Sequence, residues 1–185
     1  MSPTADDVVR AATRHYLAGT AIDMSSLAAE LGLGRATLYR RVGNREQLIS
    51  RVLAERTAHT FGEVDRRVGG AGLPRILAVL EQFMNAVIAA RPLRTLTARD
   101  PLLFIGVVMA PGPVEACATD LITGLLDEQV RAGALTLRIA SDVLAQAVVR
   151  IADSYMYSHL LGGREPELHK ALAVITLMLE SAQER

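Results

Sequence analysis

Apolar residues recur at intervals of three and four along almost the whole chain, which is the spacing of one face of an α-helix. Segments in which apolar and polar residues alternate, as they do in a half-buried strand, are scarce. The first helix is expected over about 5–18, with Val9, Ala12 and Tyr16 on its apolar side and Gly19 ending it. The pattern therefore predicts an all-α protein.

Glycine and proline divide the rest of the chain into further helices. Two short helices are expected near 25–31 and 35–42, and a long one over 45–68, where a Gly-Gly-Ala-Gly segment ends it. Beyond that point the breaks again fall at prolines and glycines, which disfavour helical backbone. The remaining predicted helices are 73–90, 93–99, 101–109, 114–132, 140–161 and 166–183.

The composition changes this picture only locally. The chain of 185 residues has 20 basic and 20 acidic residues, so its overall charge does not indicate a nucleic-acid partner. Residues 35–56 are the exception, because six arginines and two glutamates give that stretch a net charge of +4. A lone cysteine, Cys117, excludes an internal disulfide framework and a cysteine-based zinc site.

The N-terminus does not have the order of charged, apolar and small residues that marks a signal peptide, and we found no uninterrupted apolar run of about 18 residues. We therefore expect a cytoplasmic protein with no membrane partner.

Residues 25–48, SSLAAELGLGRATLYRRVGNREQL, have the spacing of a helix-turn-helix, two short helices joined by a turn of about three residues. Ser25 or Ser26 is expected to cap the first helix, and Gly32 permits the positive φ of the turn. The second helix presents donors that DNA phosphates and base edges accept, namely Arg35, Thr37, Tyr39, Arg40 and Arg41.

This segment resembles the DNA-binding domain of TetR-family repressors over about 6–56. The matching positions are Gly32, Leu33, Thr37, Leu38, Tyr39, Arg45 and Leu48. Val42 stands where the family usually has Phe, and Arg45 stands where Lys is common, so the apolar and basic characters are kept.

The resemblance implies an all-α fold of about nine helices. A three-helix helix-turn-helix domain would occupy residues 1–45, and a ligand-sensing and dimerisation domain residues 46–185, with helix 45–68 linking the two. By position, Thr37 and Tyr39 would contact phosphates, Arg45 would hold a phosphate, and Arg35 or Arg40 would read a guanine. The full set of candidate DNA contacts is Ser25, Ser26, Arg35, Thr37, Tyr39, Arg40, Arg41 and Arg45.

The longer C-terminal part contains apolar residues suited to an adaptable pocket for an effector. The candidates are Phe83, Met84, Phe104, Val107, Met109, Leu121 and Leu125. On the helix 140–161, Gln146, Arg150, Asp153 and Tyr157 share one face.

Three interpretations of this polar stripe remain open. Arg150, Asp153 and Tyr157 hold the polar end of a largely apolar effector, the stripe lies in a dimer interface, or it faces solvent with an Arg150–Asp153 surface pair. No metal and no cofactor is expected.

The last two predicted helices are apolar on more than one face. These positions are Leu144, Val148, Ile151 and Tyr155 in one helix and Leu168, Leu172, Ile175 and Leu179 in the other. In the resembling family this pair forms a four-helix bundle with its copy, which implies a homodimer.

The function expected is that of a DNA-binding transcriptional regulator, released as a repressor from a palindromic operator when a small, largely apolar effector binds. The sequence leaves open the effector, the target genes and whether the protein represses or activates. Two alternatives were weighed. A helical enzyme working around Cys117, Arg150, Asp153 or His159 is disfavoured, since no nucleophile–base spacing, phosphate loop or metal set is present. A structural interaction module would bind no DNA.

Overall fold

The computed structural model describes residues 2–162 and 165–184. Over these residues the chain forms ten α-helices and one 3-10 helix, and its only β pairing is an isolated bridge between Leu137 and Gln183. The prediction of an all-α fold is therefore confirmed. Helix boundaries lie within a few residues of those predicted, because the glycine and proline breaks fall where the helices end.

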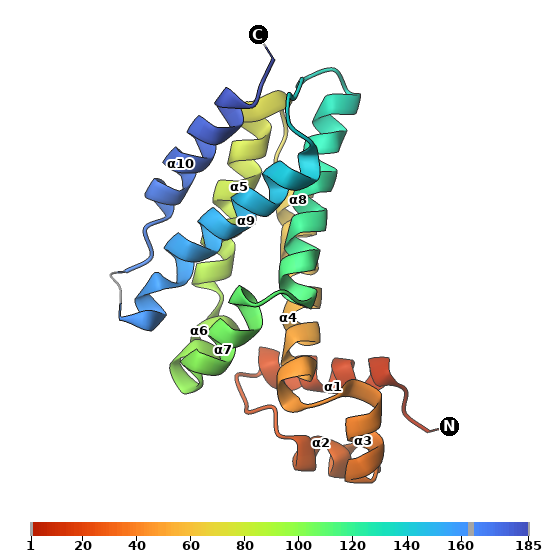
Figure 1. The fold of residues 1–185 in the computed structure, drawn as a ribbon. Coiled ribbons are helices and arrows are strands. Elements are labelled where there is room, and N and C mark those ends of the chain that lie inside the picture. The colour runs from red at the N-terminus through yellow and green to blue at the C-terminus, as the bar shows by residue number, and fades with distance from the viewer. Residues whose placement is uncertain (1, 163–164, 185) are drawn as a thin grey trace.

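Three short helices form one end of the molecule, at the bottom of Figure 1: α1 (Ala5–Leu17), α2 (Met24–Glu30) and α3 (Arg35–Val42). Asp23 caps α2, its carboxylate accepting from the Ser26 backbone N–H at 2.8 Å. The prediction that Ser25 or Ser26 caps this helix was wrong, because the helix begins earlier and Asp23 supplies a carboxylate acceptor. Gly32 has φ +63° in the α2–α3 turn, as predicted.

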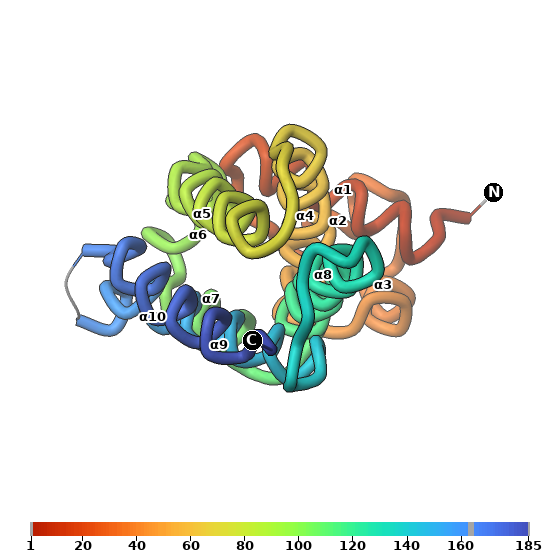
Figure 2. The backbone as a smooth tube through the Cα atoms, turned by 90° about the horizontal axis from the view of Figure 1, so that it is seen from above, coloured from red at the N-terminus to blue at the C-terminus, as the bar shows by residue number. Residues whose placement is uncertain are grey.

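A long helix, α4 (Arg45–Arg67), rises from this end into the rest of the molecule (Figure 1). Asn44 and Gln47 form a reciprocal capping box at its start. Helices α5 (Gly72–Ala89) and α8 (Pro113–Arg131) flank its upper part, and α9 (Ser141–Tyr157) and α10 (Leu168–Ser181) lie on the opposite side of the group, as Figure 2 shows from above. A 3-10 helix, Ser158–Leu161, extends α9.

Two short helices, α6 (Arg91–Arg99) and α7 (Pro101–Met109), lie where the lower and upper parts meet (Figure 1). The hydrophobic core is continuous through this junction. One buried cluster runs from Val8 and Leu48 to Phe104 and Tyr157, and a second, around Ile76, fills the upper part. The first cluster crosses the predicted boundary at residue 45, so the first three helices share a core with the longer C-terminal part.

Helix α5 is long and apolar enough to cross a membrane, with a mean hydropathy of 1.2 over Gly72–Ala89, and α7 with α8 passes the same test as a pair bent by 49°. Core helices of other proteins also meet these criteria. Here α5 reaches the length only by including Arg75 and Glu81. Its Ile76, Val79 and Leu80 are buried in the core, so α5 is built as a packed helix.

Candidate functional site

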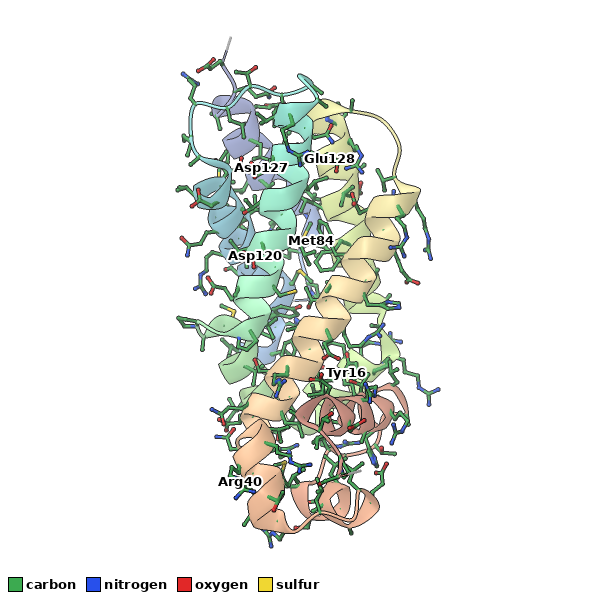
Figure 3. The ribbon with its side chains drawn as sticks, turned by 90° about the vertical axis from the view of Figure 1, so that its right-hand side faces the viewer. Tyr16, Arg40, Met84, Asp120, Asp127 and Glu128 are labelled. Carbon is green, nitrogen blue, oxygen red and sulfur yellow. The ribbon has the colours of Figure 1, made fainter. Side chains whose placement is uncertain are left out.

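The outer face of α3 carries four hydrogen-bonding side chains at the free end of the molecule: Arg35, Thr37, Tyr39 and Arg40. Buried Leu38 and Val42 anchor the opposite face of the helix. Arg35 and Arg40 are exposed, Tyr39 is 40% exposed, and Arg40 points away from the body of the protein in Figure 3. None of the four side chains has a hydrogen-bond partner among residues 2–162 and 165–184, so their donors are available to another molecule.

The other four candidate DNA contacts have different environments. Arg41 donates from Nη2 to the Ser2 hydroxyl at 2.9 Å, which holds it against the N-terminal segment. Ser26 donates its hydroxyl to Asp23 at 2.8 Å, while Ser25 is exposed. Hydrogen bonds from the Ser26 backbone and hydroxyl lower the pKa of Asp23, so this cap is a stable anion beside α3.

Arg45 is half-buried at the start of α4 and is held from two sides. Its Nε donates to the Ile22 carbonyl and its Nη1 to Asp100 Oδ2, both at 2.9 Å. Asp100 lies 55 residues further along the chain, and no periodicity in the sequence indicates this contact. The expected contact of Arg45 with a phosphate therefore has Nη2 as its remaining donor.

The upper part of the molecule contains a cavity of about 60 Å³, which we call the upper cavity. It lies among α4, α5, α8, α9 and α10 and is mostly apolar. Its polar lining comes from Thr57, Glu115, Asp153 and Tyr157. Met84, in the interior in Figure 3, is one of its apolar residues.

A second cavity of about 60 Å³, the lower cavity, lies nearer the junction with α1. It is lined by Tyr16 of α1, by Arg56 of α4 and by Phe104 of α7, among others. The two cavities are adjacent, because both are lined by Thr57, Val87, Val108, Val114 and Tyr157. Together they extend from the centre of the upper part to Tyr16 on α1.

The cavities collect half of the predicted effector residues. Phe83, Met84 and Asp153 line the upper cavity, Phe104 lines the lower one, and Tyr157 lines both. The other candidates line neither. They are Val107, which lines a separate groove beside α3 and α4, and Met109, Leu121, Leu125 and Arg150.

Sequence reasoning missed the contribution of α4 to both cavities. Leu53, Thr57 and Thr60 recur there at spacings of four and three and line the lower cavity on one face of the helix. Threonines at this helical spacing indicate the cavity-lining face of α4, but a search for apolar residues alone does not detect them.

Asp153 is a carboxyl group inside this apolar environment. Its burial raises its pKa from 3.8 to about 7, against the opposing effect of Arg150, and the charge of Glu115 adds to the rise. No donor among the residues that the structure describes bonds to its carboxylate. Burial also raises the pKa of the Tyr157 hydroxyl, and the nearby Asp153 and Tyr16 raise it further.

Arg150 does not pair with Asp153, so the ion pair expected under the solvent-facing interpretation of the stripe was wrong. Its guanidinium donates from Nη1 to the Met109 carbonyl at 3.0 Å and from Nη2 to Glu115 Oε1 at 3.1 Å. Glu115 lies on α8, close enough to α9 to form the ion pair with Arg150. Of the stripe, only Asp153 and Tyr157 reach a cavity, while Gln146 is exposed.

Large apolar side chains remain exposed on α9, α10 and the 3-10 helix. They are Val143 (56% exposed), Leu161 (63%), Val174 (40%) and Leu177 (65%). Leu144, Val148, Ile175 and Leu179, expected to take part in pairing, are instead buried within the chain's own core. The two helices do bear apolar residues on more than one face, as predicted, but the outer set is a different one. Among the described residues no cluster of three potential metal ligands occurs.

Comparison with known proteins agrees with this architecture. The family model described as tetracyclin repressor-like, C-terminal domain, matches residues 71–180. The transcriptional repressor QsdR of R. erythropolis, from the TetR family, is 40% identical, with 98% of this chain and 96% of that one covered and a TM-score of 0.93. This chain belongs to the TetR family.

Two further solved structures are more distantly similar to this chain. The repressor AlkX of Dietzia, implicated in n-alkane biodegradation, shares the fold at 23% identity and a TM-score of 0.66, over 98% of both chains. ActR of Streptomyces coelicolor, solved with (S)-DNPA, is 25% identical with a TM-score of 0.52, over 88% of this chain and 71% of that one. A comparison with functionally curated proteins gives no match.

Membership confirms the resemblance predicted from residues 25–48. TetR-family proteins are transcription regulators and not enzymes, and they bind operator DNA and effector ligands and form dimers. The enzyme alternative weighed on the sequence is thereby removed.

Proposed function

We propose that this TetR-family protein is a cytoplasmic homodimeric repressor that binds a palindromic operator through α3 and leaves it when a small, largely apolar effector enters the two cavities. The observation that carries the proposal is the outer face of α3, where Arg35, Thr37, Tyr39 and Arg40 present unpaired donors. Such donors match what phosphate oxygens and base edges accept.

The roles of the residues on α3 follow from their chemistry. Thr37 and Tyr39 donate hydroxyls to phosphates, and Arg35 or Arg40 places a guanidinium against O6 and N7 of a guanine. Arg45 contributes through Nη2. In a two-fold dimer paired through α9 and α10, two copies of α3 separated by about 34 Å would enter successive major grooves.

Release follows from the size of the cavities. At about 60 Å³ each, they are far smaller than a typical ligand site, which occupies about 300–1,000 Å³. An effector must therefore widen them, and α4, which contributes Thr57 to both, moves as it does so. Because α4 begins directly after α3, this motion changes the separation of the two recognition helices, for which a few kcal/mol of differential affinity suffices.

The test is retardation of a palindromic DNA selected from random duplexes by the purified protein. Arg40→Ala is expected to weaken binding by about 1–3 kcal/mol, roughly ten- to a hundred-fold. Arg10→Ala is the matched control, because Arg10 is an exposed arginine on α1 whose ion pair is with Asp7.

Binding should also weaken steeply with rising salt concentration, since phosphate contacts displace counterions. Absence of any salt-dependent complex with selected DNA would favour the alternative of a structural interaction module. Equal loss in the Arg10 and Arg40 variants would contradict the assignment of α3.

A further inference from the structure

The polar residues that line the upper cavity are acceptors and hydroxyls, and its nearest cation, Arg150, lies outside the lining and is already paired with Glu115. Glu115 and Asp153 are the ionisable acids that line it, and no Lys or Arg is among its lining residues. Glu115 already accepts from Arg150 at 3.1 Å. Asp153 accepts from no donor in the described parts of the chain. The cavity is therefore lined by one partly buried carboxyl whose acceptor capacity is unused.

Such a group is unfavourable in an empty apolar site. A carboxylate that lines a mostly apolar cavity is poorly hydrated on that side, and Asp153 receives no hydrogen bond from the described residues in return. A ligand that brings an N–H group restores that lost hydrogen bond, and a charge-assisted bond of this kind is stronger than one between neutral groups. A ligand carboxylate does the opposite, because it places a second negative charge beside Asp153, and Arg150 is already paired with Glu115.

Tyr157 supplies a second polar contact on the same side. Its hydroxyl is buried next to Asp153, and none of the described residues hydrogen-bonds to it. It lies one helical turn beyond Asp153 on α9, so both groups reach the same part of the cavity. An amide fits this pair, its N–H donating to Asp153 and its carbonyl accepting from Tyr157.

We infer, resting on the proposed function, that the effector is an amphiphile whose polar end carries an N–H donor and no negative charge, and that this end binds Asp153. Its apolar chain lies among Leu80, Phe83, Met84, Ile122 and Val148, which line the remainder of the upper cavity. Fatty acids and other anionic amphiphiles are excluded as effectors.

The test compares head groups on one chain length. Hexanamide, hexylamine and hexanoate, and the corresponding ten-carbon series, are titrated into the full-length protein without DNA at about pH 7.5, with binding followed by calorimetry. The amide and the amine are expected to bind at least about ten-fold more tightly than the carboxylate of equal length.

Variants test whether Asp153 and Tyr157 cause these differences in affinity. Asp153→Asn should remove the preference for the amine and raise the affinity for the carboxylate, each by about ten-fold. Tyr157→Phe should weaken the amide a few-fold and leave the amine unchanged. Asp120→Asn is the matched control, because Asp120 is exposed on α8 (Figure 3) and the substitution makes the same chemical change away from the cavity. Thermal unfolding shows that each variant is folded.

The outcomes separate this inference from the proposed function. If the amide or the amine binds through Asp153 but the operator complex persists, the ligand class holds and release by an effector fails. If hexanoate or decanoate binds as tightly as its amide, or if Asp153→Asn leaves the order of affinities unchanged, the ligand class is overturned. Binding of none of the six probes overturns it as well. Release of the operator by a carboxylate alone would overturn the ligand class and keep the proposed function.

Discussion

Arg45 and Asp100 form an ion pair, with Arg45 Nη1 and Asp100 Oδ2 2.9 Å apart, between the first residue of α4 and the junction of α6 and α7. Next to it, Arg99 donates from Nη2 to the Gly19 carbonyl at 2.8 Å, so the same junction also holds the end of α1. Helix α7 starts directly after Asp100 and contributes Val108 to both cavities. A shift of α7 is therefore passed to the start of α4, next to the recognition helix.

Replacing Asp100 by alanine should weaken the coupling between effector binding and operator binding. Operator affinity without effector is expected to stay within about three-fold of wild type, because α3 is untouched and Arg45 keeps its bond to the Ile22 carbonyl, which leaves Nη2 available to a phosphate. The effector-induced loss of affinity should shrink by about 0.5–2 kcal/mol, since one of the contacts between the two parts is gone. Retardation titrations with and without effector measure both quantities.

Arg14→Ala is the control for this prediction. Arg14 pairs with Glu30 at 2.8 Å between α1 and α2, within the DNA-facing helices. Its loss should leave the effector response unchanged. A wild-type response in the Asp100 variant would show that the coupling runs through α4 alone.

Tyr39→Phe should weaken operator binding by about 0.5–1.5 kcal/mol, the net worth of one hydrogen bond. The hydroxyl is expected to donate to a phosphate, while the ring stays in place on α3. Because Tyr39 has no hydrogen bond within the described chain, the thermal unfolding temperature should not change. An unaltered affinity in retardation assays would assign Tyr39 to packing.

Much of the fold was predictable because the determinants are local. The glycine turn after Leu31, the arginines of α3 and the proline and glycine breaks all act within a few residues of themselves. Periodicity also placed Leu38 and Val42 on the buried side of the recognition helix, as they are. The candidate DNA contacts Arg35, Thr37, Tyr39 and Arg40, which lie outside this buried side, followed from the same register.

The residues that join the two parts could not be found in this way. Arg45 and Asp100 are 55 positions apart. Arg150 pairs with Glu115, 35 positions away, and not with Asp153, which lies one turn along the same helix. Which partner wins depends on how α8 and α9 pack, and helical spacing carries no information on that. The same holds for Leu144 and Val148, whose apolar side proved to face the chain's own core.

Leu177→Glu should convert the proposed dimer into a monomer. Leu177 is the most exposed apolar residue of α10 and lies one turn from Val174, so a second copy would bury both. A charge placed there would be buried without a partner, which is strongly unfavourable. Light scattering coupled to gel filtration measures the mass in solution.

Leu102→Glu is the matched control, because Leu102 is 75% exposed but lies on α7, outside the proposed interface. The mass of the Leu102→Glu variant in solution should equal that of wild type. A dimer that persists in the Leu177 variant would place the interface on another face of the molecule.

Asp153 should make the stability of the protein fall as the pH rises. Its pKa is about 7 in the folded protein against an ordinary value of 3.8, so between these values the folded state binds the proton more tightly than the unfolded state. The stabilisation present at low pH is therefore lost as the pH rises to about 7. Arg150 and Glu115, the charged groups nearest to it, stay paired with each other.

Asp153→Asn removes this titration while keeping the shape of the side chain. At about pH 8 the free energy of unfolding of the variant is expected to exceed that of wild type by on the order of 2 kcal/mol. The difference should shrink towards about pH 5. Urea unfolding at a fixed protein concentration measures it, since the stability of a dimer depends on concentration. Asp120→Asn, which changes an exposed carboxylate, should show no such pH-dependent difference. Parallel pH profiles for wild type and Asp153→Asn would mean that Asp153 is already ionised and solvated well below pH 7, and that its carboxylate needs no donor from a ligand.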